Sequence, residues 1–354
     1  MPLIQTVTGP VEATALGTTS VHEHLFIDLG VWFDASPDPE AARIADLVVG
    51  PDTQAEVRAN PFAVRDNLVL DSDEVAAAEV ARFTSAGGRT IVDLTLDDIG
   101  RDPLRLRALS ERNGVQVVMG CGHYIAGAHP RWVRDASVET LADELVRDLT
   151  VGVRDTGVRA GVIGEIGTSD PVQPAEARVL AAACRAQLAT GAALFVHLDP
   201  WGRNGHAVLD LVEAEGVPLD RVALCHLDPS ITERPTFIRS LAARGAWVSI
   251  DIWGDEDAYG GRGMPTDRRR AAAVHQALDE GWVGQLLVAQ DVCLKTQLRA
   301  YGGRGYDHLL TGMPALLLGA GLPVAIIPQL LVDNPRRLLA GGRSTPGGPD
   351  DPGR

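Results

Sequence analysis

The sequence is poor in lysine, in basic residues as a whole and in aromatic residues. Lys295 is its only lysine, so nearly all of its basic side chains are arginines. The 32 Lys and Arg residues stand against 47 Asp and Glu residues, which gives a formal net charge of −15. Such a charge repels nucleic acid and anionic membrane surfaces. We therefore expect a small-molecule partner, with no binding to nucleic acid or membrane.

Long apolar runs and paired cysteines are also missing. No segment approaches the roughly 18 apolar residues that a spanning helix needs, and the first residues lack the basic and apolar regions of a secretory signal. These absences predict a cytoplasmic protein. The four cysteines are widely spaced and form no Cys-x-x-Cys pair, which disfavours a disulfide framework and a zinc finger. We expect reduced thiols, with Cys225 packed between sheet and helices.

Eight short, β-branched apolar runs alternate with longer segments of helical period. The runs are residues 19–25, 90–96, 115–119, 160–166, 193–198, 221–227, 247–252 and 286–289. The helical segments are residues 71–85, 137–153, 174–189, 206–215, 234–244, 266–280, 306–318 and 324–339. This alternation predicts a single-domain α/β fold, a (β/α)₈ TIM barrel with a parallel sheet. An open doubly wound sheet is the alternative, but it calls for a glycine-rich loop after an early strand.

Local signals divide the chain further. Asp71 with Glu74 resembles a capping box, and Pro174 is placed as a first-turn proline. Residues 1–340 are expected to form the barrel domain. Residues 31–60 are an insertion after the first strand and form either a lid or a solvated excursion. The tail, residues 341–354, lacks apolar residues and is expected to be disordered.

Candidate metal ligands gather at the ends of the predicted strands. His22 and His24 are two residues apart on one strand, so their side chains share a face and can hold one ion. In a barrel, chemistry belongs at the C-terminal ends of the strands. Four further ligands stand at such ends: Glu165, His197, His226 and Asp291. Each alone is more often a buried, hydrogen-bonded structural residue, but six coincident placements indicate two divalent ions sharing a bridging carboxylate.

Four segments carry a resemblance to a known family. They are Thr18 to Leu25, Ile91 to Asp102, Gly161 to Thr168 and Gly302 to Asp307. Together they resemble the phosphotriesterase-related family of the amidohydrolase superfamily, from about Val7 to Leu339. The resemblance implies a binuclear metal hydrolase on a (β/α)₈ barrel. By position, it implies that His22, His24 and Asp291 hold the more buried ion, that His197 and His226 hold the more exposed ion, and that Glu165 bridges them.

Glu165 stands where the best-known members of that family carry a carbamylated lysine. The only lysine, Lys295, follows Asp291 by four residues, so a carbamate bridge at strand four is excluded. The sequence resembles a subgroup that uses glutamate as the bridge, and glutamate also offers two anionic oxygens. This difference argues against organophosphate hydrolysis as the main activity.

The expected chemistry is attack by a metal-bridging hydroxide on a carbonyl, because two divalent ions acidify a shared water. Asp291 would take the proton of that hydroxide. The segment Gly120 to Tyr124 is similar to a motif of lactonase members, which makes Tyr124 a candidate polariser of the carbonyl or else a rim aromatic. Trp201 and Trp253 are expected to wall the pocket.

The loop after strand eight supplies three further candidates for substrate binding, Lys295, Arg299 and Tyr301. Lys295 would hold an anionic group of the substrate, or else be a solvated charge. The leading function is hydrolysis of a lactone, carboxylic ester or amide. The alternatives are phosphoryl-ester hydrolysis and a non-catalytic metal-binding barrel. Zinc is the first choice of metal, with manganese, cobalt and iron as alternatives, and the family resemblance implies a homodimer.

Overall fold

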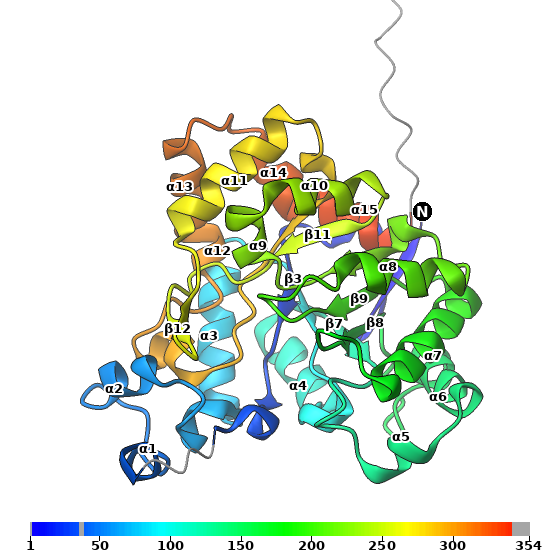
Figure 1. Ribbon diagram of the computed structural model, residues 1–354, viewed down its shortest axis with the longest axis horizontal. Coiled ribbons are helices and arrows are strands. Elements are labelled where there is room, and N and C mark those ends of the chain that lie inside the picture. The colour runs from blue at the N-terminus through cyan, green and yellow to red at the C-terminus, as the bar shows by residue number, and fades with distance from the viewer. Residues whose placement is uncertain (1, 35–38, 342–354) are drawn as a thin grey trace, which may run out of the picture.

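The computed structural model describes residues 2–34 and 39–341. Eight parallel strands form its central sheet (Figure 1). In chain order they are β3 (Thr19–Glu23), β6 (Thr90–Asp93), β7 (Gln116–Cys121), β8 (Val162–Gly167), β9 (Leu194–His197), β10 (Val222–Leu224), β11 (Trp247–Ile250) and β14 (Leu286–Val288). Each strand pairs with the next along the chain. All eight strands lie where the sequence predicts them.

The sheet curves into a nearly closed barrel. Its first and last strands approach each other where the backbone N–H of Asp291 donates to the carbonyl of His22 at 3.1 Å. The expected (β/α)₈ architecture is therefore confirmed. The antiparallel hairpin of β1 (Leu3–Thr6) and β2 (Gly9–Glu12) precedes the first barrel strand. Two further strand pairs are small: β4 (Ile27–Asp28) with β5 (Val69–Leu70), and β12 (Ala258–Tyr259) with β13 (Arg262–Gly263).

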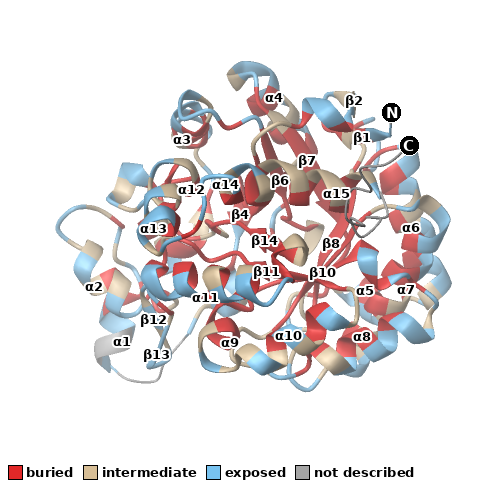
Figure 2. Ribbon diagram, turned by 90° about the horizontal axis from the view of Figure 1, so that it is seen from above, coloured by how far each residue is buried: buried red, intermediate tan, exposed pale blue. Residues whose placement is uncertain are grey.

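Helices surround the barrel and turn their buried faces toward it (Figure 2). The longer ones are α3 (Asp73–Ser85), α4 (Pro103–Asn113), α6 (Val138–Thr150), α7 (Pro174–Thr190), α8 (Gly205–Ala214), α10 (Pro235–Ala243) and α11 (Asp267–Asp279). The shorter ones are α1 (Pro39–Ile44), α2 (Gln54–Ala59), α5 (Arg131–Asp135), α9 (Asp228–Glu233), α12 (His308–Thr311), α13 (Met313–Gly319), α14 (Ile326–Pro328) and α15 (Asn334–Ala340). No described helix is both long enough and apolar enough to span a bilayer.

Some helix boundaries differ from the prediction. Helix α3 is capped by Ser72, whose hydroxyl accepts from the backbone N–H of Val75, and not by Asp71. The predicted helix 306–318 is divided at Gly312 between α12 and α13. The predicted helix 324–339 contains a π-helical turn, Gln329–Asp333, between α14 and α15. Pro174 does occupy the first turn of α7, because its missing N–H costs nothing there.

The two larger clusters of buried apolar side chains lie inside the barrel and between the strands and the helices. Cys225 lies in the barrel interior with Val21, Phe195 and Leu287, so its predicted place between sheet and helices is wrong. The reason is local backbone geometry. His226 has a φ of 60°, in the left-handed region, which breaks the side-chain alternation that the prediction assumed.

The insertion after the first strand has its own small core. Val57 of α2 is buried there with Ile44, Val49 and Val64. Helix α2 also reaches the loops beside the barrel mouth, since Gln54 donates to the carbonyl of Tyr301 and Arg58 pairs with Asp257 at 3.4 Å. The insertion is therefore packed against the barrel. The predicted tail lies outside the described residues beyond Gly341.

Candidate metal centre

The side chains of the His-Glu-His segment at the C-terminal end of β3 point in two directions. The rings of His22 and His24 lie side by side, with centroids 5.4 Å apart. Glu23 points elsewhere: it accepts from the hydroxyl of Ser20 at 2.6 Å and from the backbone N–H groups of Gln290 and Val292, both at 3.0 Å. Glu23 therefore fixes the backbone on either side of Asp291. Strand alternation places the two imidazoles in the cluster and the carboxylate behind it.

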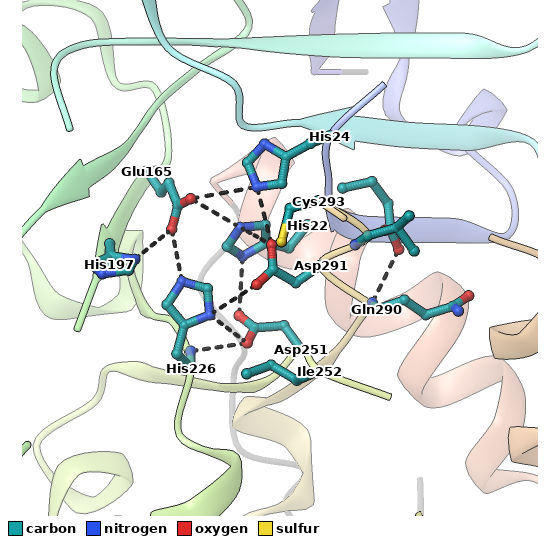
Figure 3. A network of polar contacts seen from close by, with 12 residues as sticks. His22, His24, Glu165, His197, His226, Asp251, Ile252, Gln290, Asp291 and Cys293 are labelled. Carbon is teal, nitrogen blue, oxygen red and sulfur yellow. Dashed lines mark hydrogen bonds and ion pairs between the residues drawn. The ribbon is translucent and has the colours of Figure 1, made fainter. Parts of the chain in front are cut away.

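Glu165 lies between two pairs of histidines (Figure 3). Its Oε1 is 3.5 Å from Nε2 of both His22 and His24. Its Oε2 is 3.2 Å from Nδ1 of His197 and 2.9 Å from Nε2 of His226. Each carboxylate oxygen therefore faces a different pair of imidazoles.

Gly164 allows this approach of β8 to β9. A Cβ atom at Gly164 would lie 2.1 Å from the carbonyl oxygen of Phe195, and its φ of +102° suits only glycine. A side chain at this position would push Glu165 away from the histidines.

Asp291 completes the cluster from the end of β14. Its Oδ1 lies 3.0 Å from Nε2 of His24 and 3.6 Å from Nε2 of His22, and its Oδ2 lies 3.6 Å from Nδ1 of His226. Its φ of 48° is left-handed, like that of His226. Left-handed backbone at non-glycine residues is costly, and it persists where surrounding contacts hold it. The six predicted ligands are thus brought together.

Asp251 is a member of the cluster that the sequence interpretation missed. Its Oδ2 is 3.1 Å from Nδ1 of His22, and its Oδ1 is 3.1 Å from Nδ1 of His226. Its Oδ1 also accepts from the backbone N–H of His226 at 2.9 Å. A signal existed in the sequence, because Asp251 lies at the C-terminal end of the seventh predicted strand. One buried carboxylate therefore orients one histidine from each pair.

The donor set fits divalent cations. Ligand atoms of His22, Glu165 and His226 converge within 4.8 Å, and so do those of His22, His24 and Asp291. Nε2 of His22 is buried without a hydrogen-bond partner in the described chain. Imidazole nitrogens and carboxylate oxygens suit zinc and neighbouring transition metals. The structure therefore contains a candidate His/Glu/Asp metal cluster.

The pKa shifts in the cluster also favour a bound cation. Burial opposes a charge on His24, but hydrogen bonds to Asp291 and Glu165 outweigh it and raise the pKa of His24 to about 9. Burial also opposes ionisation of Glu165, but His22 and His226 hold the pKa of Glu165 well below its usual range. The carboxylates thus attract positive charge to the imidazoles, and a divalent cation would replace those protons.

A cavity of about 230 Å³ opens above the cluster. His24, Glu165, His197, His226 and Asp291 line its floor. Tyr124 also lines it, with its hydroxyl 3.3 Å from Nδ1 of His197. Burial and the Glu165 carboxylate raise the pKa of the Tyr124 phenol well above its ordinary value, so Tyr124 keeps its proton at neutral pH.

The predicted substrate-binding residues divide into two groups. Trp201 lines the cavity, whereas Trp253, Lys295, Arg299 and Tyr301 are not among its described lining residues. Lys295 pairs with Asp66 at 2.5 Å, and Arg299 forms an ion pair with Asp307 through Nε at 2.6 Å. The loop after β14 runs beside the cavity, and these two cations face other parts of the chain.

Comparisons with known proteins agree with this architecture. The phosphotriesterase family matches residues 2–339. The human N-acetyltaurine hydrolase is 30% identical over 341 residues, which cover 95% of this chain and 97% of the relative. A resiniferatoxin-binding protein from Rhodobacter sphaeroides is 40% identical with a TM-score of 0.94, covering 96% of this chain and 95% of that one.

A phosphotriesterase homology protein from Escherichia coli, solved with phosphate in its active site, is 28% identical. Its TM-score is 0.76, and the match covers 92% of this chain and 99% of that one. The family and its curated relatives are hydrolases, so the expectation of a hydrolytic enzyme is confirmed. The sequence resemblance is confirmed as well, since the match spans nearly the whole chain. This chain belongs to the phosphotriesterase family.

Proposed function

We propose that this protein is a binuclear metal-dependent hydrolase that cleaves a lactone, carboxylic ester or amide of a small molecule. The observation that carries the proposal is the position of Glu165, with one oxygen toward His22 and His24 and the other toward His197 and His226. A carboxylate in this position can bridge two cations.

Each ion would have its own set of side chains. His22, His24 and Asp291 would hold one, and His197 and His226 would hold the other, with Glu165 shared. Asp251 would keep the rings of His22 and His226 in the orientation that binding requires, as carboxylates behind metal-ligating histidines do. Zinc is the first choice, with manganese, cobalt and iron as alternatives.

Bound divalent ions supply an acidified water, available as hydroxide near neutral pH, and polarise a carbonyl oxygen. Asp291 lines the cavity floor and can accept the proton of the attacking water, then pass it to the leaving group. Tyr124, held as a neutral phenol, can donate a hydrogen bond to the carbonyl oxygen as negative charge develops on it.

Metal content and turnover test the proposal together. We expect about two equivalents of metal per chain, and hydrolysis of at least one class in a panel of lactones, aryl esters, N-acyl amides and phosphotriesters. Asp291→Asn should retain much of the metal and lose most of kcat, with Asp210→Asn on the surface as a control. Full activity in Asp291→Asn, or in metal-free protein, would refute the proposed roles.

Phosphoryl-ester hydrolysis is the second candidate. It is favoured by the phosphate in the active site of the Escherichia coli homologue. The same panel separates the two, because kcat/KM for phosphotriesters would then exceed that for every carbonyl substrate. A barrel that binds its ligand without turnover would instead bind metal and hydrolyse no member of the panel.

A further inference from the structure

Five aromatic side chains form a continuous wall around the cavity, which we term the aromatic arc: Tyr124, Trp32, Phe62, Tyr259 and Trp201. Trp32 lies 6.5 Å from Tyr124 and 6.1 Å from Phe62, measured between ring centroids. Tyr259 continues the wall, 5.2 Å from Phe62 and 6.4 Å from Trp201. The chain has only 6 Trp, 4 Tyr and 6 Phe residues, so gathering five of them here is a marked concentration.

The aromatic arc is assembled from separate loops. Trp32 follows the first barrel strand, Tyr124 follows β7, Trp201 follows β9 and Tyr259 belongs to β12. The aliphatic side chains of Leu29, Ile125, Ile252, Met264 and Leu294 line the spaces beside the rings. Such a wall favours an apolar group, because the group leaves water without losing hydrogen bonds.

Apart from the histidines of the metal cluster, the ionisable side chains that carry charge among the described lining residues of the cavity are all acidic. Apart from Glu165 and Asp291 in the cluster, the lining contains Asp199 and Asp255, and it contains no lysine or arginine. Asp255 is buried, and its oxygens accept from the hydroxyl of Tyr259, from Nε2 of Gln297 at 2.8 Å and from the backbone N–H of Asp257 at 2.8 Å. Asp199 accepts from the backbone N–H of Trp201 at 2.9 Å.

Three basic side chains near the cavity are either paired with carboxylates or exposed. Lys295 pairs with Asp66, and Arg58 pairs with Asp257. The guanidinium of Arg262 lies 5.8 Å from the ring centroid of Trp201, but Arg262 is exposed on β13. Away from the metal cluster, an anionic group against the aromatic arc would therefore lie near Asp199 and Asp255 with no lysine or arginine among the described lining residues, which is unfavourable.

We infer that the cavity selects an uncharged substrate whose non-reacting group is apolar, an aryl or branched alkyl group lying against the aromatic arc. The same substrate carrying a carboxylate or sulfonate on that group is rejected. This inference rests on the proposed hydrolase and names its substrate class. It also separates this chain from its relative named for N-acetyltaurine, because that compound carries a sulfonate.

Matched probes of similar size test the selectivity. N-acetyl-3-methylbutylamine and N-acetyltaurine differ mainly in an apolar against an anionic end group, and N-acetyl-3-phenylpropylamine adds an aryl group. Binding to the metal-loaded protein is measured by tryptophan fluorescence and calorimetry, and hydrolysis is measured separately. We expect the neutral probes to bind about 100-fold more tightly than N-acetyltaurine, as an uncompensated charge requires. Equal or tighter binding of N-acetyltaurine would overturn the inference.

Three variants and one control identify which side chains cause the selectivity. Phe62→Ala should weaken binding of the aryl probe at least about tenfold, with Phe33→Ala, outside the cavity lining, as the matched control. Asp199→Asn keeps an acceptor for the backbone N–H of Trp201 and removes a charge, so it should reduce the ratio of the affinities for neutral and anionic probes. An unchanged ratio of affinities would overturn the electrostatic argument. Loss of N-acetyltaurine binding in Arg262→Gln would show an anion site and would also overturn it.

Binding and turnover measurements distinguish a wrong selectivity from a wrong function. Selective binding of the neutral probes without hydrolysis of any panel substrate would refute the proposed function and leave the selectivity of the cavity intact. Hydrolysis that favours anionic over neutral substrates would support the hydrolase and refute the selectivity.

Discussion

Replacing Asp251 with alanine removes the carboxylate that, among the described residues, hydrogen-bonds Nδ1 of both His22 and His226. Asp251 is completely buried, and its oxygens lie 3.1 Å from Nδ1 of each ring. Loss of a carboxylate behind a metal-ligating histidine typically lowers metal affinity about 10- to 100-fold. Because the two histidines belong to different pairs, we expect both ions to bind at least about tenfold more weakly.

The variant also leaves buried donors without acceptors. The backbone N–H of His226 and an N–H of one or both rings lose Asp251, at about 1–3 kcal/mol each. We therefore expect metal-free Asp251→Ala to unfold about 3 kcal/mol more easily. Competition with a chelator measures affinity, and denaturant unfolding measures stability. Asp210→Asn, on the surface beside Arg244, is the control.

If Asp251 only positions the two histidines, its variants should differ from those of Asp291 in kcat. At saturating metal, Asp251→Asn should recover much of kcat, because asparagine keeps one acceptor oxygen, whereas Asp291→Asn should not recover. Unchanged affinity for both ions in Asp251→Ala would refute the reasoning, even if the variant were less stable.

Three other perturbations have outcomes that the structure specifies. In metal-free protein, the raised pKa of His24 contributes stability that is complete below about pH 6.5 and is lost as the pH rises through about 9. The Tm of chelator-treated protein should therefore decrease across this pH window, and the Tm of metal-loaded protein should not. Gly164→Ala should cost about 3 kcal/mol and abolish metal binding, because its Cβ would meet the Phe195 carbonyl at 2.1 Å; circular dichroism and metal analysis check this. Lys295→Ala should lower the free energy of unfolding by about 1 kcal/mol, because Lys295 pairs with Asp66. It should leave KM unchanged for both neutral and anionic substrates.

The sequence predicts the barrel well because each strand is a short β-branched run that periodicity alone identifies. It also brings the six ligands to one rim, since parallel strands end together. Cys225 shows where this reasoning stops. Strand alternation predicts that Cys225 points out of the barrel if His226 points in. The left-handed φ of His226 breaks this alternation, so that Cys225 packs in the interior, and no local sequence pattern predicts such a backbone.

The character of the cavity was harder to predict than its metal cluster, for a physical reason. Lys295 is near Asp291 in sequence, which suggested an anion site, yet its partner Asp66 comes from a segment 229 residues away. Trp32, near the start of the insertion, and Phe62, just after its end, also line the cavity, although local patterns leave the insertion as lid or excursion. Ligands at strand ends are fixed by one regular element, but a wall built from loops depends on long-range packing. The charge of the wall, and with it the choice of substrate, therefore follows from tertiary contacts.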